Sequence, residues 1–193
     1  LDRVLDAFGG APAHVVGLSM GGVIALDYAL HRPARVRSLV LADTGRGPAH
    51  DFAPDEFERF LALRRAPLLA GATPADIAPA VARSLVSPRA VPGALAALEG
   101  SLARLHAGSY LKTLETVTRY DGLRDLHRVA VPTLVVVGAD DPVTPPARVR
   151  AFAASIPGAR YAEIPDAGHL ANLEQPARFD ALLLGFLTPL LRD

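Results

Sequence analysis

The chain has 193 residues, enough for one domain with a sizeable core, or for one domain and a small insertion. Its 20 basic and 20 acidic residues cancel, so no overall charge attracts nucleic acid or an anionic membrane surface. The absence of cysteine excludes disulfides, thiol nucleophiles and cysteine-bound metals. The longest apolar runs are too short to span a bilayer. We therefore expect a soluble protein of the cytoplasm, with no nucleic-acid partner and no membrane partner.

The first part of the chain alternates helix and strand. Residues 1–8 carry apolar side chains at helical spacing and precede two glycines, which predicts the last turns of a helix. The run "HVVGL" predicts a short buried strand, and "MGGVIALDYALHR" predicts a helix that ends before Pro33. The nearly continuous apolar run from Val36 to Ala42 predicts a strand buried on both faces. Strand, helix and strand in this order indicate a parallel sheet and an α/β fold.

The pattern changes between residues 50 and 125. Apolar residues are spaced helically there, without a β-branched run, so we expect an insertion of a few short helices. Prolines punctuate this segment at positions 54, 67, 74, 79, 88 and 92.

The core pattern resumes after the insertion. We expect a strand from Thr133 to Val137, a helix around residues 147–155, a strand from Arg160 to Ile164 and a final amphipathic helix over residues 175–191. The expected organisation is a core of residues 1–49 and 126–193, with a partial parallel sheet and flanking helices, interrupted by the helical segment 50–125.

Ser19 lies at the junction of the first predicted strand and helix, in the motif Gly17-Leu18-Ser19-Met20-Gly21. Ligands gather at the carboxyl ends of strands in a parallel α/β sheet. We expect a turn so tight that side chains at positions 17 and 21 would collide, which glycine avoids. The serine hydroxyl would then be exposed, and the Met20 N–H at the helix N-terminus would form half of an oxyanion hole. The motif also arises by chance, and its position at this junction distinguishes it from an ordinary tight turn.

A serine hydroxyl is a poor nucleophile and needs a base that is itself held in place. His169 follows the last predicted strand in the loop "DAGHLAN", at the same edge of the sheet as Ser19, and a glycine precedes it. We therefore assign His169 as the base. The other histidines lie in a strand, at a helix end or in and beside the insertion, where packing or surface roles are expected: His14, His31, His50, His106 and His127.

Three aspartates at predicted strand ends could orient this histidine: Asp43, Asp140 and Asp141. Asp141, after the strand "TLVVVG", is our choice over Asp140 and Asp43, and the resulting order serine, aspartate, histidine is the one expected for hydrolases of this architecture. Each aspartate could instead cap a helix or form a turn, and Asp140 suits that role well.

Three segments of the chain, "GLSMGG", "PTLVVVGADDPVTPP" and "IPDAGHLANLEQP", resemble the α/β-hydrolase superfamily. They are most similar to its lid-bearing branch, which contains 3-oxoadipate enol-lactonases and related carboxylic-ester hydrolases. The resemblance extends from Leu1 to the end of the chain. It implies that Ser19 is the nucleophile, Asp141 the acid and His169 the base. It also implies that residues 50–125 form a lid that covers the serine and shapes the substrate pocket.

The resembling family normally has further strands before this point, and a His-Gly loop that supplies the second oxyanion N–H. We therefore expect this chain to correspond to the C-terminal part of a hydrolase, beginning in the helix before the serine strand. That strand would then have an unpaired edge, which is a pairing and aggregation hazard. We expect the edge to pair with a partner chain, as in a homo-oligomer, or with the missing N-terminal segment, or else to make the chain poorly soluble.

The predicted function is hydrolysis of a small carboxylic ester or lactone through an acyl-enzyme, without a metal or an organic cofactor. Serine at position 19 argues against the relatives that dehalogenate or open epoxides, which use an aspartate there. Cofactor-free perhydrolases share the serine triad and stay an alternative. The other alternative is a truncated, catalytically weak or silent binding protein, because one lost oxyanion donor lowers turnover by on the order of a hundredfold or more.

The substrate pocket is expected to be small and mostly apolar, because the helical segment is rich in alanine and leucine. Arginines on short helices are usually solvated, but such side chains can also bind a substrate carboxylate. Four arginines of the segment are candidates for that contact: Arg64, Arg65, Arg83 and Arg104.

Overall fold

The computed structural model describes residues 1–121 and 124–191. The core helices and strands expected from the sequence are confirmed, within about a residue at each end. In chain order the elements are α1 (Asp2–Ala7), β1 (Ala13–Leu18), α2 (Met20–His31), η1 (Pro33–Arg35), β2 (Val36–Ala42), α3 (Pro48–Asp51), α4 (Pro54–Leu69), α5 (Pro74–Arg83), α6 (Pro92–Ala103), α7 (Ala107–Arg119), η2 (Leu126–Arg128), β3 (Thr133–Gly138), α8 (Pro146–Ala154), β4 (Arg160–Ile164), α9 (Ala171–Glu174) and α10 (Pro176–Leu190).

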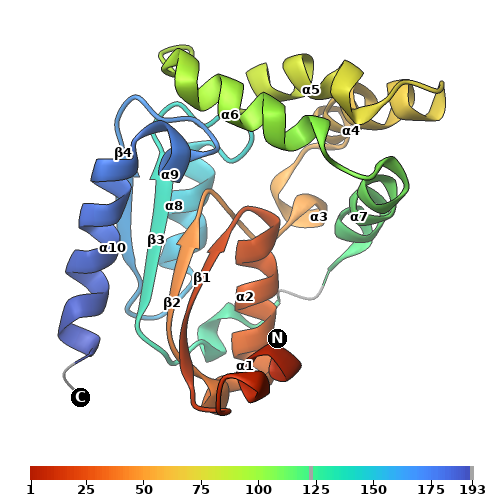
Figure 1. The fold of residues 1–193 in the computed structure, drawn as a ribbon. Helices are drawn as coiled ribbons and strands as arrows, with labels where there is room; N and C mark the ends of the chain where they lie inside the picture. The colour runs from red at the N-terminus through yellow and green to blue at the C-terminus, as the bar shows by residue number, and fades with distance from the viewer. Residues whose placement is uncertain (122–123, 192–193) are drawn as a thin grey trace.

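The four strands form one parallel sheet in the order β1-β2-β3-β4. Helix α10 covers one face of the sheet, and α2 and α8 lie on the other side (Figure 1). The chain therefore has the three-layer arrangement that parallel strands require, because crossover helices must cover both faces. Parallel strands also bring their carboxyl ends, and the loops that follow them, to one edge of the sheet.

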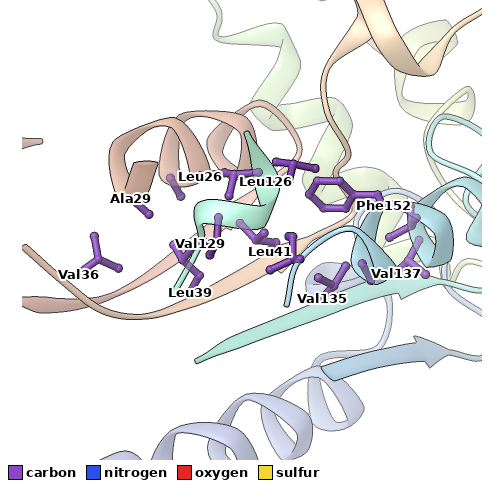
Figure 2. Close-up of a cluster of buried hydrophobic side chains, with 14 residues drawn as sticks. Leu26, Ala29, Val36, Leu39, Leu41, Leu126, Val129, Val135, Val137 and Phe152 are labelled. Carbon is purple, nitrogen blue, oxygen red and sulfur yellow. The ribbon is translucent and has the colours of Figure 1, made fainter. Parts of the chain in front are cut away.

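Alternate side chains of the central strands face the two helical layers. In β3, Val135 and Val137 pack on the α2 and α8 side, together with Leu41 of β2 and Phe152 of α8 (Figure 2). On the opposite face, Val136 packs against the α10 layer. Burial on both faces explains why these strands are continuously apolar in the sequence.

Helices α3 to α7 form the segment that the sequence predicts as a helical insertion. They lie beyond the carboxyl ends of the strands (Figure 1) and contain a small core of their own around Leu68, Ile77 and Val81. Two of the punctuating prolines do not separate helices, since Pro67 and Pro79 lie inside α4 and α5. Prolines instead mark the first turn of helices, as in α5 and α6 of this segment and in α8 of the core. The predicted segment extends to residue 125, and residues 122–123 lie outside the described residues.

Strand β1 is one of the two edge strands of the described sheet, and an unpaired edge of this strand is what the sequence predicts. Val16 in its middle is 47% exposed. Pairing of this edge with another strand stays a prediction. No helix among residues 1–121 and 124–191 is long and apolar enough to cross a membrane.

We expect the open edge of β1 to make the chain associate at high concentration, because unpaired N–H and C=O groups beside an exposed valine form a template for strand pairing. Val16→Lys should reduce this association, measured as the concentration dependence of the mass in light scattering. Val91→Lys is the matched control, since Val91 is comparably exposed but lies in the helical segment. Equal effects of the two substitutions would assign the association to exposed apolar surface in general.

Candidate active site

Ser19 occupies a strained turn between β1 and α2. Its backbone has φ 52° and ψ −119°, in the positive-φ region that non-glycine residues rarely adopt. The Ser19 N–H donates to the carbonyl oxygen of Ala42 at 2.9 Å, which anchors the turn to β2. A Cβ atom at Gly17 would lie 2.3 Å from the carbonyl oxygen of Gly21, so only glycine allows the helix to start this close to the strand.

The collision expected at Gly21 is not found, because a Cβ atom there would have no neighbour within 4 Å. The second crowded glycine is Gly22, where a Cβ atom would lie 2.5 Å from Cγ2 of Thr44. The sequence pattern predicts a collision at position 21, whereas the helix turns position 21 outward and position 22 toward the end of β2.

The imidazole of His169 lies between Ser19 and Asp141. Its Nε2 is 2.8 Å from Ser19 Oγ, and its Nδ1 is 2.9 Å from Asp141 Oδ2. An ionised carboxylate can only accept, so Nδ1 carries the proton and Nε2 is free to accept the serine hydroxyl hydrogen. His169 is 5% exposed and Asp141 is 3% exposed, so this hydrogen-bonded chain is shielded from water. The structure therefore brings together the three residues that the sequence assigns as nucleophile, base and acid.

Asp141 is held by an Asx-type turn in the loop after β3. Its Oδ1 accepts from the backbone N–H groups of Val143 and Thr144, and its Oδ2 accepts from the Thr144 hydroxyl at 2.6 Å. These bonds satisfy the buried carboxylate and aim the remaining lone pair at the histidine. The pattern of an aspartate followed by a threonine three residues later is a signal from which Thr144 could have been predicted.

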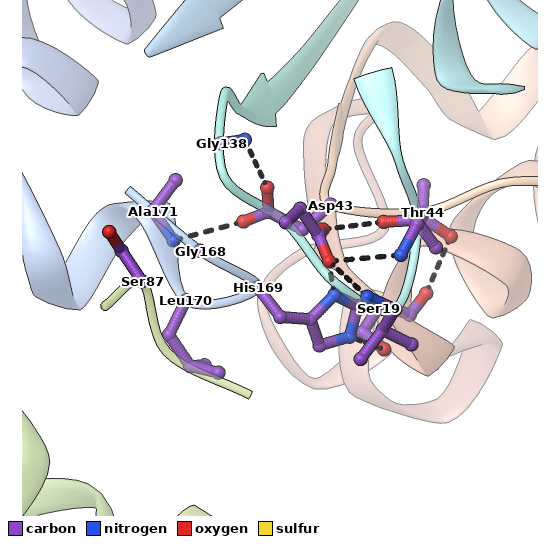
Figure 3. Close-up of polar contacts among 12 residues, drawn as sticks. Ser19, Asp43, Thr44, Ser87, Gly138, Gly168, His169, Leu170 and Ala171 are labelled. Carbon is purple, nitrogen blue, oxygen red and sulfur yellow. Dashed lines mark hydrogen bonds and ion pairs between the residues drawn. The ribbon is translucent and has the colours of Figure 1, made fainter. Parts of the chain in front are cut away.

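The two other candidate aspartates have different roles. Asp140 accepts from the Ser87 hydroxyl and forms an ion pair with Arg89. Asp43 accepts from the backbone N–H of Gly138 at 2.9 Å and from that of Ala171 at 3.1 Å (Figure 3). Asp43 thereby links the loop that carries Asp141 to the loop that carries His169.

Asp43 is a buried carboxyl group next to another acid. Burial, and secondarily the charge of Asp141, raises the pKa of Asp43 to about 7, although His169 and the two backbone N–H groups act in the opposite direction. Its backbone also has positive φ, 46°, which aspartate and asparagine tolerate better than most residues. The next residue, Thr44, donates its hydroxyl to the carbonyl oxygen of Ser19 at 2.7 Å.

Met20 begins α2 directly after the serine. The N–H groups of a helix's first turn have no partner within the helix and carry its positive dipole end. The Met20 N–H therefore lies at the start of α2 next to Ser19, and its role as an oxyanion donor stays a prediction.

A cavity of about 470 Å³ opens at this site. Ser19, Met20 and His169 line it together with side chains from the helical segment, and the lining is mostly apolar, as expected. Examples from both parts of the chain are Val23, Phe52, Phe60, Val81, Leu102 and Leu114. His106, which the sequence analysis assigned to packing or surface, also lines the cavity, and its Nδ1 accepts from the Ser109 N–H.

The connection between α5 and α6 is attached to the histidine loop by buried hydrogen bonds that the sequence does not reveal. The His169 N–H donates to the Leu85 carbonyl at 2.7 Å. Glu174, which is 4% exposed, accepts from the Ser87 N–H at 2.8 Å and from the Gly168 N–H at 2.9 Å. Its pKa is raised by this burial. The position of the His169 imidazole is therefore coupled to the helical segment.

Comparison with known proteins supports the same family. A family profile described as "alpha/beta hydrolase fold" matches residues 1–176. A protein of Azorhizobium caulinodans named "Putative carbamate hydrolase RutD" is 35% identical over 189 residues, which cover 95% of this chain and 69% of the relative.

Two solved structures are similar over nearly the whole chain. A thermophilic esterase from Thermogutta terrifontis has a TM-score of 0.84 at 26% identity, with 97% of this chain and 69% of the esterase covered. The enol-lactonase from Burkholderia xenovorans LB400 has a TM-score of 0.79 at 28% identity, with 96% of this chain and 69% of the enol-lactonase covered.

The adjacent glycines Gly21 and Gly22 are expected to respond oppositely to alanine. Gly21→Ala should leave the free energy of unfolding unchanged or raise it by up to about 1 kcal/mol, because alanine is the better helix former and the space is open. Gly22→Ala should lower it by about 1–3 kcal/mol through the contact with Thr44. Denaturant unfolding of the two variants measures the difference, and similar values for both would contradict it.

Asp43→Asn tests the raised pKa of Asp43. In the folded protein this carboxyl stays protonated up to pH about 7, whereas in the unfolded chain it ionises near 3.8. Its contribution to stability is therefore fully present below pH about 4 and is lost as the pH rises to about 7. The melting temperature of the wild type relative to Asp43→Asn should fall across this range. A difference that is constant or grows with pH would show that Asp43 is ionised in the folded state.

Proposed function

The chain belongs to the α/β-hydrolase family and is an enzyme of that class, and from this premise we propose that it hydrolyses a carboxylic ester or lactone through an acyl-enzyme on Ser19. The observation that carries the proposal is the continuous hydrogen-bonded chain from Ser19 Oγ through His169 to Asp141, at 2.8 and 2.9 Å. A serine joined to a buried histidine, which a carboxylate orients, is the arrangement that activates a hydroxyl for attack on a carbonyl.

In the proposed reaction, His169 Nε2 takes the proton of Ser19 Oγ while Oγ bonds to the substrate carbonyl carbon. Asp141 keeps the imidazole in the required tautomer and stabilises the imidazolium that forms. Collapse of the tetrahedral intermediate breaks the bond to the alcohol oxygen, which receives the proton from Nε2. Water then attacks the acyl-enzyme with His169 again acting as base, and the free acid leaves.

The negative charge of the tetrahedral oxygen is placed next to the start of α2. The Met20 N–H and the positive end of the helix dipole would stabilise it there. The strain at Ser19 supports this role, because positive φ lifts the hydroxyl out of the strand toward the cavity that Met20 also lines.

We assign residues 50–125 to a lid over the serine. The walls of the cavity come from α4, α5, α6 and α7 as well as from the core, so this segment shapes the space that the acyl group would occupy. The relatives named as an enol-lactonase and an esterase act on the two substrate types proposed here. The cytoplasmic location stays a prediction from the sequence.

A fluorophosphonate probe tests the activated serine without knowledge of the substrate. We expect mass spectrometry to locate the label on Ser19, and we expect both Ser19→Ala and His169→Ala to abolish labelling.

Hydrolysis of a 4-nitrophenyl ester should fall by about 10⁴-fold in Asp141→Asn, because the histidine loses the carboxylate that selects its tautomer.

Asp140→Asn is the matched control for the acid, since this neighbouring carboxylate contacts Ser87 and Arg89 instead of the histidine. Its hydrolysis rate should stay close to that of the wild type. A folded protein that neither takes the label nor hydrolyses the ester would refute the serine mechanism and favour a binding role.

A further inference from the structure

Arg64 on α4 is a buried cation in the wall of the active-site cavity. Its side chain lines the same cavity as Ser19 and His169, and the residue is only 3% exposed. The other three arginines that the sequence offered as substrate contacts, Arg65, Arg83 and Arg104, are exposed. Arg64 and Arg65 are adjacent on one helix, so the 100° step between them turns one inward and the other to solvent.

The guanidinium of Arg64 has neutral partners. Its Nη1 donates to the Phe60 carbonyl at 2.9 Å and its Nη2 donates to the Ser84 hydroxyl at 3.1 Å. Its Cζ lies 3.7 Å from the centre of the Phe60 ring, which covers one face of the group, and it also interacts with Tyr110. Stacking on a ring leaves the edges of the planar group open, and the two hydrogen bonds use two of its five N–H donors.

No carboxylate pairs with Arg64 among residues 1–121 and 124–191. A half-buried arginine elsewhere in the fold is treated differently, since Arg148 donates to both carboxylate oxygens of Glu56. Burial disfavours the charged form of Arg64 and lowers its pKa, and the counteracting interactions come from Tyr110. A buried charge without a counter-ion is unfavourable for folding. A ligand that supplied the opposite charge would therefore be bound favourably next to Arg64.

The acids in the wall of the cavity already have hydrogen-bond partners. Asp43 accepts from Gly138 and Ala171, and Asp51 accepts from the Gly47 N–H at 2.9 Å. Burial raises the pKa of both carboxyls, that of Asp43 to about 7. Neither acid forms an ion pair with Arg64, so an anion that pairs with this guanidinium would come from a bound molecule.

We propose that Arg64 binds a carboxylate of the substrate, so that the enzyme acts on esters or lactones that carry a free acid group. This inference rests on the proposed function, since it places the scissile carbonyl at Ser19 and the acid group at Arg64 in one cavity. A carboxylate matches the fork of N–H donors on a guanidinium and forms a charge-assisted hydrogen bond with it in an apolar surrounding.

Paired 4-nitrophenyl esters test the charge requirement. The hydrogen succinate, glutarate, adipate and suberate esters each carry a terminal carboxylate, and the corresponding methyl-capped diesters are their neutral counterparts. For at least one chain length, we expect the wild type to prefer the charged ester by about tenfold or more in kcat/KM. Arg64→Gln should remove this preference by raising KM for the charged ester, with little change for the neutral one.

Arg65→Gln is the matched control, because it removes an exposed arginine from the next position of the same helix. It should keep the full preference for the charged ester. If Arg64 only ties α4 to Ser84, Arg64→Gln will lower stability and affect both esters equally. That result, or the absence of a preference in the wild type at every chain length, would overturn the proposal.

Binding without turnover separates the two proposals. Ser19→Ala protein, which cannot form an acyl-enzyme, is titrated with hexanoate and with 1-hexanol while its melting temperature is followed. We expect hexanoate to raise the melting temperature and hexanol to have a smaller effect, and we expect Arg64→Gln to abolish the difference. Equal effects of hexanoate and hexanol would overturn the carboxylate site even if Ser19 takes the fluorophosphonate label. A specific response to hexanoate in a chain that is never labelled would instead retain the carboxylate site and refute the hydrolase mechanism.

Discussion

The geometry of the site depends on one dipeptide, Asp43-Thr44, at the end of β2. Thr44 bonds the carbonyl of Ser19, and Asp43 bonds the N–H groups of Gly138 and Ala171. Gly138 is three residues before the candidate acid, and Ala171 is two residues after the candidate base. The three loops that carry the proposed triad are therefore joined through one strand end. This fixes their relative positions more tightly than the hydrogen bonds of the triad alone, which is the kind of support that precise catalytic geometry requires.

A second set of buried bonds connects the triad to the helical segment. Glu174 holds Ser87 and Gly168, and Leu85 accepts from the backbone of His169. The backbones approach so closely there that a Cβ atom at Gly168 would lie 2.4 Å from the Ser87 nitrogen. The helical segment thus has a core of its own around Leu68, Ile77 and Val81, and it is also hydrogen-bonded to the loop of the proposed base His169. Changes in it would act on the imidazole as well as on the walls of the cavity.

The sequence predicts those features of the fold and the site that are determined by residues close together in the chain. The motif around Ser19, the apolar runs of β2 and β3 and the loop of His169 are local signals, and all three lie where they were expected. Glu174 and Arg64 could not be assigned in the same way, because their surroundings are built from segments far apart in the chain. The steric role of Gly22 could not be predicted for the same reason, since the atoms that a Cβ there would meet belong to Thr44, in the loop after β2.

The proposed carboxylate contact also bears on the chemistry at Ser19. Attack on the carbonyl creates a negative oxygen in a mostly apolar cavity, where charges interact strongly because little water screens them. An acid group elsewhere on the same substrate would oppose that new charge unless a cation neutralised it. Arg64 supplies such a cation in the wall of the cavity. With Arg64 neutralising the acid group of the substrate, that group and the oxyanion at Ser19 can both be accommodated in one apolar cavity.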